Sequence, residues 1–411
     1  MIDCKSSKKK ILVLTPIYIG EGIPKTFTPV VHYFAREWIK NGHDVRVIHN
    51  SAFYPRFFYF IAFFFSGIIA SVTGTNVPTR RLSRFKYYVI DKVAVYRMPM
   101  FKIAPHLKFS QKRINKQTEN IFNIINREGF EPDLIIGHWS NPQLELIYKL
   151  KNRIASCKTC LVMHDNGNTI SRLYKKNYRK LIDSIDVWGY RSAPIKRSFE
   201  ANFGKRNSSF MCFSGIPKNF TEHSNNKTFG DELKKFIFVG TLIRRKFPTK
   251  LIEAIDAVYE KKDFYINYVG EGNELKKMKA LICKKELSHC VKLNGYLPRN
   301  KVQQLMIDSE CFVMISKGEA YGLVYLEAMA AGCIVIASRN EGFDGVINHG
   351  ENGFLCESGN EIELACIIRL INNLSSEEKK VISRNAFNTA KKLSDKNVAE
   401  DYLEFLSNEI K

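Results

Sequence analysis

Two glutamates, Glu319 and Glu327, are separated by seven intervening residues in the segment 316–332, which reads SKGEAYGLVYLEAMAAG. A carboxylate only accepts hydrogen bonds, so this pair suits the hydroxyl groups of a sugar or of a ribose. A purely structural interpretation is also open, in which Glu319 caps a helix, Glu327 is solvated, and the alanines only permit close packing.

The same segment predicts a strand, a loop and a helix in that order. The apolar run Cys311–Ile315 has the length and branching of a buried parallel strand, and apolar periodicity begins at Gly322. The first N–H groups of such a helix, at Gly322, Leu323 and Val324, have no intrahelical partner and favour an anion. A phosphate beside two hydroxyl-binding carboxylates indicates a site for a sugar nucleotide.

The sequence E-x-Y-G-L-V-x-L-E-A-M-A-A-G closely resembles the signature of the retaining glycosyltransferases of family 4, which have the GT-B fold. In that family the first glutamate meets the donor sugar and the second meets the ribose of the nucleotide. The resemblance therefore implies these roles for Glu319 and Glu327. It also implies retention by a front-face displacement, in which a donor phosphate oxygen takes the acceptor proton.

Length and composition favour two domains, because 411 residues with 45% hydrophobic residues exceed what one core usually supports. Together with the resemblance they predict an α/β fold of two Rossmann-like domains facing across a cleft. We expect an acceptor-side domain over 1–217, a polar linker over 218–234, and a nucleotide-sugar domain over 236–391. A helix within 392–411 is expected to cross back to the first domain.

The first domain opens with a βαβ pattern. A strand at Lys10–Pro16 is followed by a loop with Gly20 and Gly22, a helix from about Lys25 to Asn41, and a second strand. The loop does not read G-x-G-x-x-G, which weakens a dinucleotide site there. The resemblance implies that Gly20 faces the cleft on the acceptor side, while an ordinary turn remains open.

Two later strands end in histidines, His138 after Asp133–Gly137 and His164 after Leu161–Met163. Ligands of open α/β sheets bind beyond such carboxyl ends. The two strands are similar to the histidine strands of family 4, which implies that His164 approaches the donor sugar and the acceptor. His138 is a second acceptor-side candidate, ranked below His164.

The second domain begins with an apolar strand that ends at Gly240, and a basic loop with Arg244, Arg245 and Lys246 follows it. Cations at the carboxyl end of a strand can clamp a diphosphate. Lys246 matches the diphosphate lysine of the family, but Thr241 stands where the family usually has arginine. Arg244 or Arg245 is therefore proposed as a substitute for it. An exposed basic turn is the alternative.

Neither a metal nor a cofactor is expected. The pair Cys157-x-x-Cys160 has no second pair of ligands at zinc spacing. The predicted diphosphate site also has its own cations and helix N–H groups. Scattered cysteines without a signal peptide indicate reduced thiols and a cytoplasmic location.

The net charge of +22 favours an anionic partner. The segment 57–72, FFYFIAFFFSGIIASV, is free of charge and is bounded by Arg56 and by four further cations, Arg80, Arg81, Arg84 and Lys86. It is too short for a membrane span within a continuous α/β domain. A contact with the inner face of the cell membrane and a helix packed under the sheet are both open.

These observations predict a retaining hexosyltransferase that moves a sugar from a nucleotide diphosphate to a hydroxyl of a lipid-linked or surface-polysaccharide acceptor, as in lipopolysaccharide or capsule synthesis. A sugar-nucleotide epimerase and a non-catalytic nucleic-acid-binding protein are the alternatives. The second is disfavoured because the sequence has no recognised nucleic-acid module.

Overall fold

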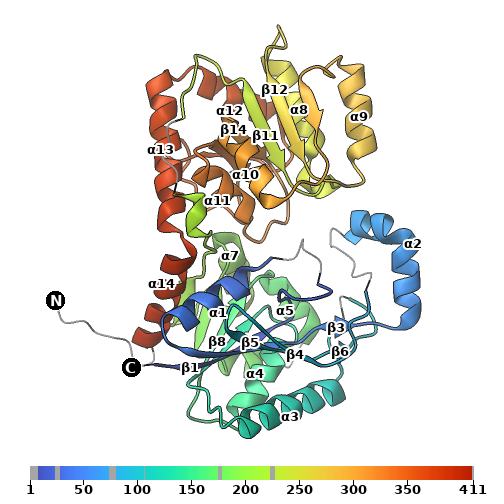
Figure 1. Ribbon diagram of the computed structural model, residues 1–411, viewed down its shortest axis with the longest axis vertical. Helices are drawn as coiled ribbons and strands as arrows, with labels where there is room; N and C mark the ends of the chain where they lie inside the picture. The colour runs from blue at the N-terminus through green and yellow to red at the C-terminus, as the bar shows by residue number, and fades with distance from the viewer. Residues whose placement is uncertain are drawn as a thin grey trace, which may run out of the picture.

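A computed structural model shows two α/β domains, with the second above the first in Figure 1 and long C-terminal helices along one side. It describes the residues 8–23, 28–73, 80–105, 107–174, 178–222 and 227–409.

The first domain is built on an eight-stranded sheet in the order β10-β9-β8-β7-β1-β2-β5-β4. Its pairings are parallel except that β4 is antiparallel to β5. The strands are β1 (Lys10–Thr15), β2 (Asp44–His49), β4 (Lys86–Ile90), β5 (Val93–Arg97), β7 (Leu134–His138), β8 (Lys158–Met163), β9 (Val187–Tyr190) and β10 (Ser209–Met211). A separate pair joins β3 (Ala52–Phe53) and β6 (Met100–Phe101).

The helices of this domain follow the strands as crossovers or insertions. They are α1 (Val30–Lys40), α2 (Arg56–Thr73), α3 (Gln111–Arg127), α4 (Gln143–Lys151), α5 (Gly167–Tyr174), α6 (Tyr178–Asp183) and α7 (Ala193–Phe203). The first helix begins later than the predicted Lys25, at Val30, and the residues 24–27 lie outside the described part of the chain.

The second domain has a six-stranded, wholly parallel sheet in the order β13-β12-β11-β14-β15-β16. Its strands are β11 (Lys235–Val239), β12 (Tyr265–Val269), β13 (Val291–Leu293), β14 (Cys311–Met314), β15 (Ile334–Ser338) and β16 (Phe354–Cys356). Its helices are α8 (Pro248–Val258), α9 (Leu275–Lys284), α10 (Arg299–Ile307), α11 (Leu323–Ala330), α12 (Glu361–Asn372) and α13 (Ser376–Lys392), with short turns at η2 (Lys218–Phe220) and η3 (Arg244–Lys246). The predicted fold class is confirmed.

The segment 218–234, predicted as a polar linker, is not a free connection throughout. Phe220, Phe229 and Leu233 are buried in the core of the second domain. The three apolar side chains are widely spaced among polar residues, so the segment has no periodicity that would have revealed their burial.

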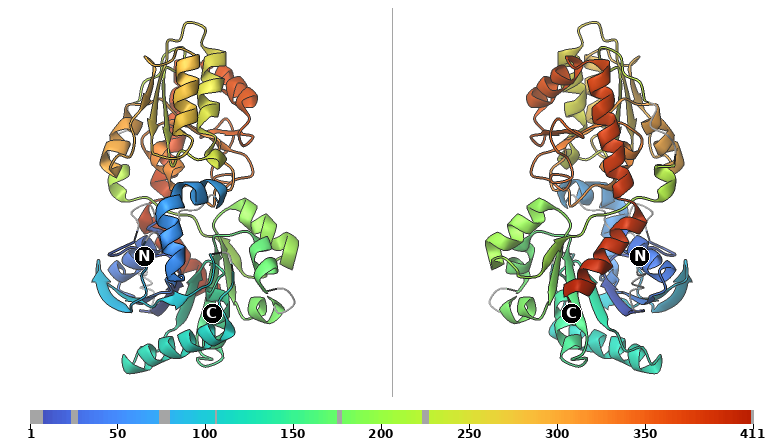
Figure 2. Two further views of the ribbon diagram at one scale, coloured as in Figure 1. Left: turned by 90° about the vertical axis from the view of Figure 1, so that its right-hand side faces the viewer. Right: turned by 90° about the vertical axis from the view of Figure 1, so that its left-hand side faces the viewer.

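The last helix, α14 (Asp395–Glu409), returns to the first domain, as the right-hand view of Figure 2 shows. Tyr402 packs edge-on against Phe34 and Trp38 of α1, and the Trp38 indole donates a hydrogen bond of 2.9 Å to the carbonyl of Ala399. Burial of these large apolar surfaces stabilises the crossing.

Asp395 begins this helix, and one of its carboxylate oxygens lies 2.9 Å from Nη2 of Arg36. Burial raises the pKa of Asp395 to about 6, which the Arg36 guanidinium opposes. Between about pH 4 and this value the folded protein holds a proton that the unfolded chain has lost, so the contribution of Asp395 to stability falls as the pH rises.

The variant Asp395→Asn tests this assignment, because its side chain is neutral at every pH. Relative to the unmodified protein, its melting temperature should be more favourable at about pH 7 than at about pH 4. A difference independent of pH would contradict this assignment.

Candidate active site

A cavity of about 930 Å³ lies between the two domains. Loops that follow strands of both sheets contribute to its wall, where sheets of this kind bind ligands. Five wall residues directly follow a strand: Trp139, His164, Arg191, Gly240 and Gly270.

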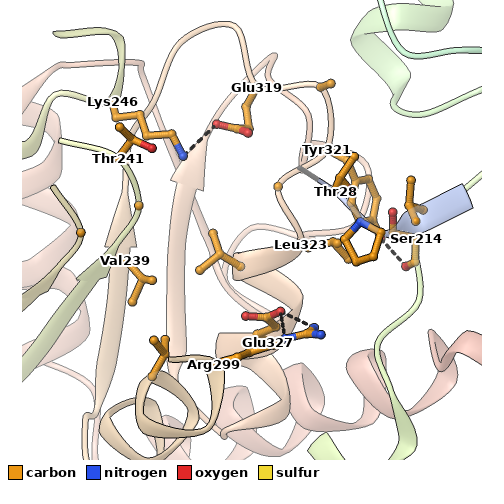
Figure 3. Close-up of a pocket in the computed structure, with 18 of the residues that line it drawn as sticks. Thr28, Ser214, Val239, Thr241, Lys246, Arg299, Glu319, Tyr321, Leu323 and Glu327 are labelled. Carbon is orange, nitrogen blue, oxygen red and sulfur yellow. Dashed lines mark hydrogen bonds and ion pairs between the residues drawn. The ribbon is translucent and has the colours of Figure 1, made fainter. Parts of the chain in front are cut away.

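The start of α11 forms one side of the cavity (Figure 3). Gly322 is its N-cap with φ of +87°, and a Cβ there would lie 2.5 Å from the ring of Tyr325. That ring is fixed, because the Tyr325 hydroxyl donates to the carbonyl of Met314 at 2.7 Å. Only glycine therefore suits this turn, which presents Leu323 and Val324 at the wall.

Glu319 precedes this turn and lies next to two cations. Its Oε2 is 3.6 Å from Nζ of Lys246 and 3.4 Å from Nη1 of Arg245. The Lys246 side chain, which is only 12% exposed, comes so close to Gly240 that a Cβ there would lie 3.0 Å from Nζ. Glu319, Lys246 and Gly240, three residues predicted from the sequence, thus meet at the cavity.

Arg244 does not join them. It is exposed on the 3₁₀ turn η3 and does not line the cavity, whereas Arg245 turns back toward Glu319. The sequence could not separate the two arginines, because the direction of each side chain depends on this single turn.

Glu327 lies on α11 and is held by Arg299 of α10. The guanidinium donates two hydrogen bonds to Oε1, of 3.0 Å from Nε and 2.5 Å from Nη2. Nη1 also donates to the hydroxyl of Tyr33, on α1 of the other domain, at 2.7 Å. Burial raises the pKa of Glu327, and Arg299 opposes that rise. The second carboxylate oxygen remains available to accept hydrogen bonds from a ligand.

The two predicted histidines contact each other, but only one of them reaches the cavity. Nδ1 of His138 lies 3.0 Å from Nε2 of His164, and His164 stacks on Trp139 with ring centroids 3.7 Å apart. Burial lowers the pKa of His138 to about 3 and that of His164 well below its usual range. Both rings are therefore neutral at physiological pH.

The assignment of His138 to the acceptor wall needs correction. Its side chain is completely buried behind His164, stacked near Phe34, and it does not line the cavity. The structure thus gives His138 a positioning contact with His164.

Gly20, the other acceptor-side candidate, does line the cavity. A Cβ at this position would lie 2.6 Å from the hydroxyl oxygen of Tyr88.

The wall also contains residues that were not identified from the sequence, among them Trp139, Arg191 and Arg299. The first two follow strands directly, so the reasoning applied to the histidines could have found them. Arg299 opens a helix distant in sequence from Glu327, and no local pattern indicates their contact. Within the described ranges, no group of three or more His, Cys, Asp or Glu residues could hold a metal ion.

Comparison with known proteins relates this chain to glycosyltransferases. The family model "Glycosyl transferases group 1" matches residues 219–389. An uncharacterised glycosyltransferase of Methanocaldococcus jannaschii, MJ1178, is 27% identical over 85% of this chain and 94% of its own length. The amylovoran biosynthesis glycosyltransferase AmsK of Erwinia amylovora is 29% identical over 59% of this chain and 62% of its own.

Solved structures share the fold over nearly the whole length. Anabaena Alr3699/HepE, in complex with UDP and glucose, has a TM-score of 0.64 at 18% identity and covers 97% of this chain and all of its own. The lipopolysaccharide outer core galactosyltransferase WaaB has a TM-score of 0.69 at 16% identity, over 97% of this chain and 99% of its own. The predicted resemblance and enzyme class are confirmed: residues 219–389 match the group 1 glycosyltransferases, the relatives over the longer chain are glycosyltransferases, and the chain has the GT-B fold.

Proposed function

We propose that the enzyme transfers a sugar, with retention, from a nucleotide-diphosphate donor to a hydroxyl of a lipid-linked or surface-polysaccharide acceptor. The observation that carries this proposal is one cavity at which Glu319, Lys246, Glu327 and the start of α11 meet His164 from the other domain. The ribose, the diphosphate and the sugar of the donor substrate would then each have a protein group of suitable chemistry to bind.

The ribose would bind the free oxygen of Glu327, and the diphosphate would bind the N–H groups at the start of α11 and the Lys246 ammonium. Glu319 would accept hydrogen bonds from the donor sugar. The complexes of the Anabaena relative with UDP support a uridine nucleotide as the first donor to test.

Lys246 and the helix N–H groups would stabilise the charge that develops on the departing diphosphate. The acceptor hydroxyl would attack from the same face and give its proton to a phosphate oxygen of the donor. Neutral His164 can exchange hydrogen bonds with the sugar or the acceptor. No metal is needed in this scheme, because the positive charge comes from the protein.

A thermal-shift screen of nucleotide sugars tests the proposal, because a ligand that binds only the folded state raises its melting temperature. We expect a nucleotide-diphosphate sugar to stabilise the protein, and equally so with EDTA present. Nucleosides without phosphate serve as the matched control and should give a smaller shift. Stabilisation by no nucleotide diphosphate would overturn the proposed donor site.

Helix α2 of the first domain carries a surface of exposed aromatic side chains. Helix α2 stands at the edge of the first domain, on the side away from α13 and α14 (Figure 1). Four of its phenylalanines are between 63% and 72% exposed: Phe57, Phe60, Phe63 and Phe64. Packing under the sheet, one of the two interpretations of the sequence, is therefore wrong for these side chains. No helix in the described ranges is long and apolar enough to cross a membrane.

We propose that α2 lies in the interface of an anionic membrane. Arg56 at its start and Arg80, Arg81 and Arg84 after it are exposed, so cations flank the apolar surface. AmsK and the lipopolysaccharide core glycosyltransferase LpsD of Rhizobium meliloti are named for polysaccharide synthesis, which supports a lipid-linked or surface acceptor at the inner face of the cell membrane.

Replacing Phe60, Phe63 and Phe64 together with serine should lower binding to anionic vesicles on the order of tenfold or more, because their apolar area no longer leaves water. Since all three are exposed, the melting temperature should change little. Vesicle sedimentation and a melting curve measure the two effects.

The matched control replaces three exposed apolar residues of the second domain, Ile362, Leu370 and Val381, with serine. This variant should bind vesicles like the unmodified protein. Unchanged binding of the phenylalanine variant would remove α2 as the membrane contact.

A further inference from the structure

Arg191 is a buried cation on the wall of the active-site cavity. It follows β9 directly, it is 2% exposed, and it lines the cavity with His164 and Tyr321. Its Nη1 donates to the carbonyl of Cys212 at 2.6 Å and its Nη2 donates to the hydroxyl of Ser214. These contacts hold the guanidinium in a fixed place at the junction of the two domains.

An aromatic ring from the second domain covers this guanidinium. The guanidinium carbon of Arg191 lies 4.8 Å from the ring centroid of Tyr321. The Tyr321 hydroxyl donates a hydrogen bond to the carbonyl of Ser214 at 3.2 Å. Tyr321 immediately precedes Gly322, the N-cap of α11. Arg191 therefore lies next to the turn at which the proposed diphosphate binds.

Among the described residues, Arg191 has no carboxylate partner. Three cationic side chains line the described wall, and two of them have a carboxylate: Lys246 has Glu319 and Arg299 has Glu327. In the described part of the chain, no Asp or Glu oxygen lies within 4.0 Å of the Arg191 guanidinium. Its hydrogen-bond partners are the carbonyl and the thiol of Cys212 and the hydroxyl of Ser214, which carry no net charge.

A buried charge without a counter-ion is costly, and buried arginines are normally paired. A neutral amide could donate to the carbonyl of Cys212 and the hydroxyl of Ser214, so these bonds alone do not require arginine. The charge at this place suits an anion in the cavity, which the guanidinium binds with remaining N–H groups.

We propose that Arg191 binds a phosphate or another acidic group of a substrate in this cavity. The inference rests on the proposed function, which supplies two sources for the anion: the donor diphosphate and an acidic group on the acceptor. The second domain has Thr241 at the position where family 4 usually has its phosphate-binding arginine, which favours the donor. Arg191 would then replace that arginine from the opposite domain.

The test compares Arg191→Gln with the unmodified protein by calorimetry, using UDP, uridine and inorganic phosphate. If the donor is the source, Arg191→Gln should weaken UDP binding about tenfold to a hundredfold and leave uridine binding unchanged, because a charge-assisted hydrogen bond is lost. If the acceptor is the source, UDP binding should be unchanged. Inorganic phosphate should then bind the UDP-saturated unmodified protein but not the variant.

Arg197→Gln is the control for charge, since Arg197 lies on the next helix, is 56% exposed and does not line the cavity. It should bind all probes like the unmodified protein. Arg191→Lys keeps the charge without the fork and should recover part of the lost affinity, which a merely structural role would not predict.

Equal binding of UDP and of phosphate by a folded Arg191→Gln and the unmodified protein would overturn the proposal. If Arg191→Gln does not fold, Arg191→Lys provides the comparison, and its unchanged affinities would overturn the proposal in the same way. Failure of the unmodified protein to bind UDP or any nucleotide of the screen would count against the proposed function instead.

Discussion

Replacing Lys246 with alanine is expected to lower turnover at saturating donor on the order of a hundredfold, the usual effect of removing one donor that stabilises developing charge. The Lys246 side chain is 12% exposed, and its ammonium lies 3.6 Å from Glu319 at the cavity (Figure 3). In such a shielded place a charge acts more strongly on a departing diphosphate than in water. Steady-state kinetics with the donor that the screen selects would measure the loss.

Arg244→Ala is the matched control, because Arg244 belongs to the same short turn but is exposed and away from the cavity. The sequence assigned Arg244 and Lys246 to one diphosphate clamp, and the structure separates them. Arg244→Ala should therefore keep nearly full turnover. Full activity of Lys246→Ala, or equal losses in both variants, would contradict the assignment of the leaving-group contact.

Replacing Glu327 with alanine should weaken nucleotide binding about tenfold to a hundredfold, because a ribose hydroxyl loses a charged acceptor. Arg299 fixes Oε1 of this carboxylate with two hydrogen bonds, so the other oxygen is already oriented before the donor arrives. Calorimetric titration with the nucleotide diphosphate measures the change.

Glu319→Gln is the contrasting variant, since Glu319 is expected to contact the donor sugar and not the ribose. It should lower turnover while nucleotide affinity stays close to that of the unmodified protein. Equal nucleotide affinity of Glu327→Ala and the unmodified protein would show that the ribose binds elsewhere.

Affinity should also depend on pH through Glu327. Burial raises the pKa of this carboxyl group, so protonation on acidification removes the acceptor at a higher pH than for a carboxyl group in water. Nucleotide binding of the unmodified protein should therefore weaken as the pH falls toward this pKa, and Glu327→Gln should show less of this dependence.

The parts of the site that were predictable from the sequence are those encoded in single segments. The strand, turn and helix around Gly322 place Glu319 and Glu327 by local periodicity alone, and the position of His164 follows from the end of its strand. Lys246 was found in the same way, from a basic loop after a strand.

The remaining parts depend on contacts between segments far apart in the chain. Arg299 meets Glu327 only because α10 packs beside α11, and Arg191 meets Tyr321 only where the two domains join. His138 is the last residue of β7, whereas His164 is the first residue after β8, and α1 and α14 cover His138. Strand ends indicate which residues can reach a cavity, and tertiary packing decides which of them do.

The most direct test of the account uses the donor selected by the screen, labelled with carbon-13 in its sugar, with and without an extract of membrane lipids. We expect the label to move to the lipid fraction only when the extract is present, with the anomeric configuration of the donor retained in the NMR spectrum, and we expect Glu319→Gln to transfer little of it. Inverted configuration would contradict the retaining mechanism. Conversion of the donor to an isomeric nucleotide sugar without any acceptor would contradict glycosyl transfer itself and favour an epimerase.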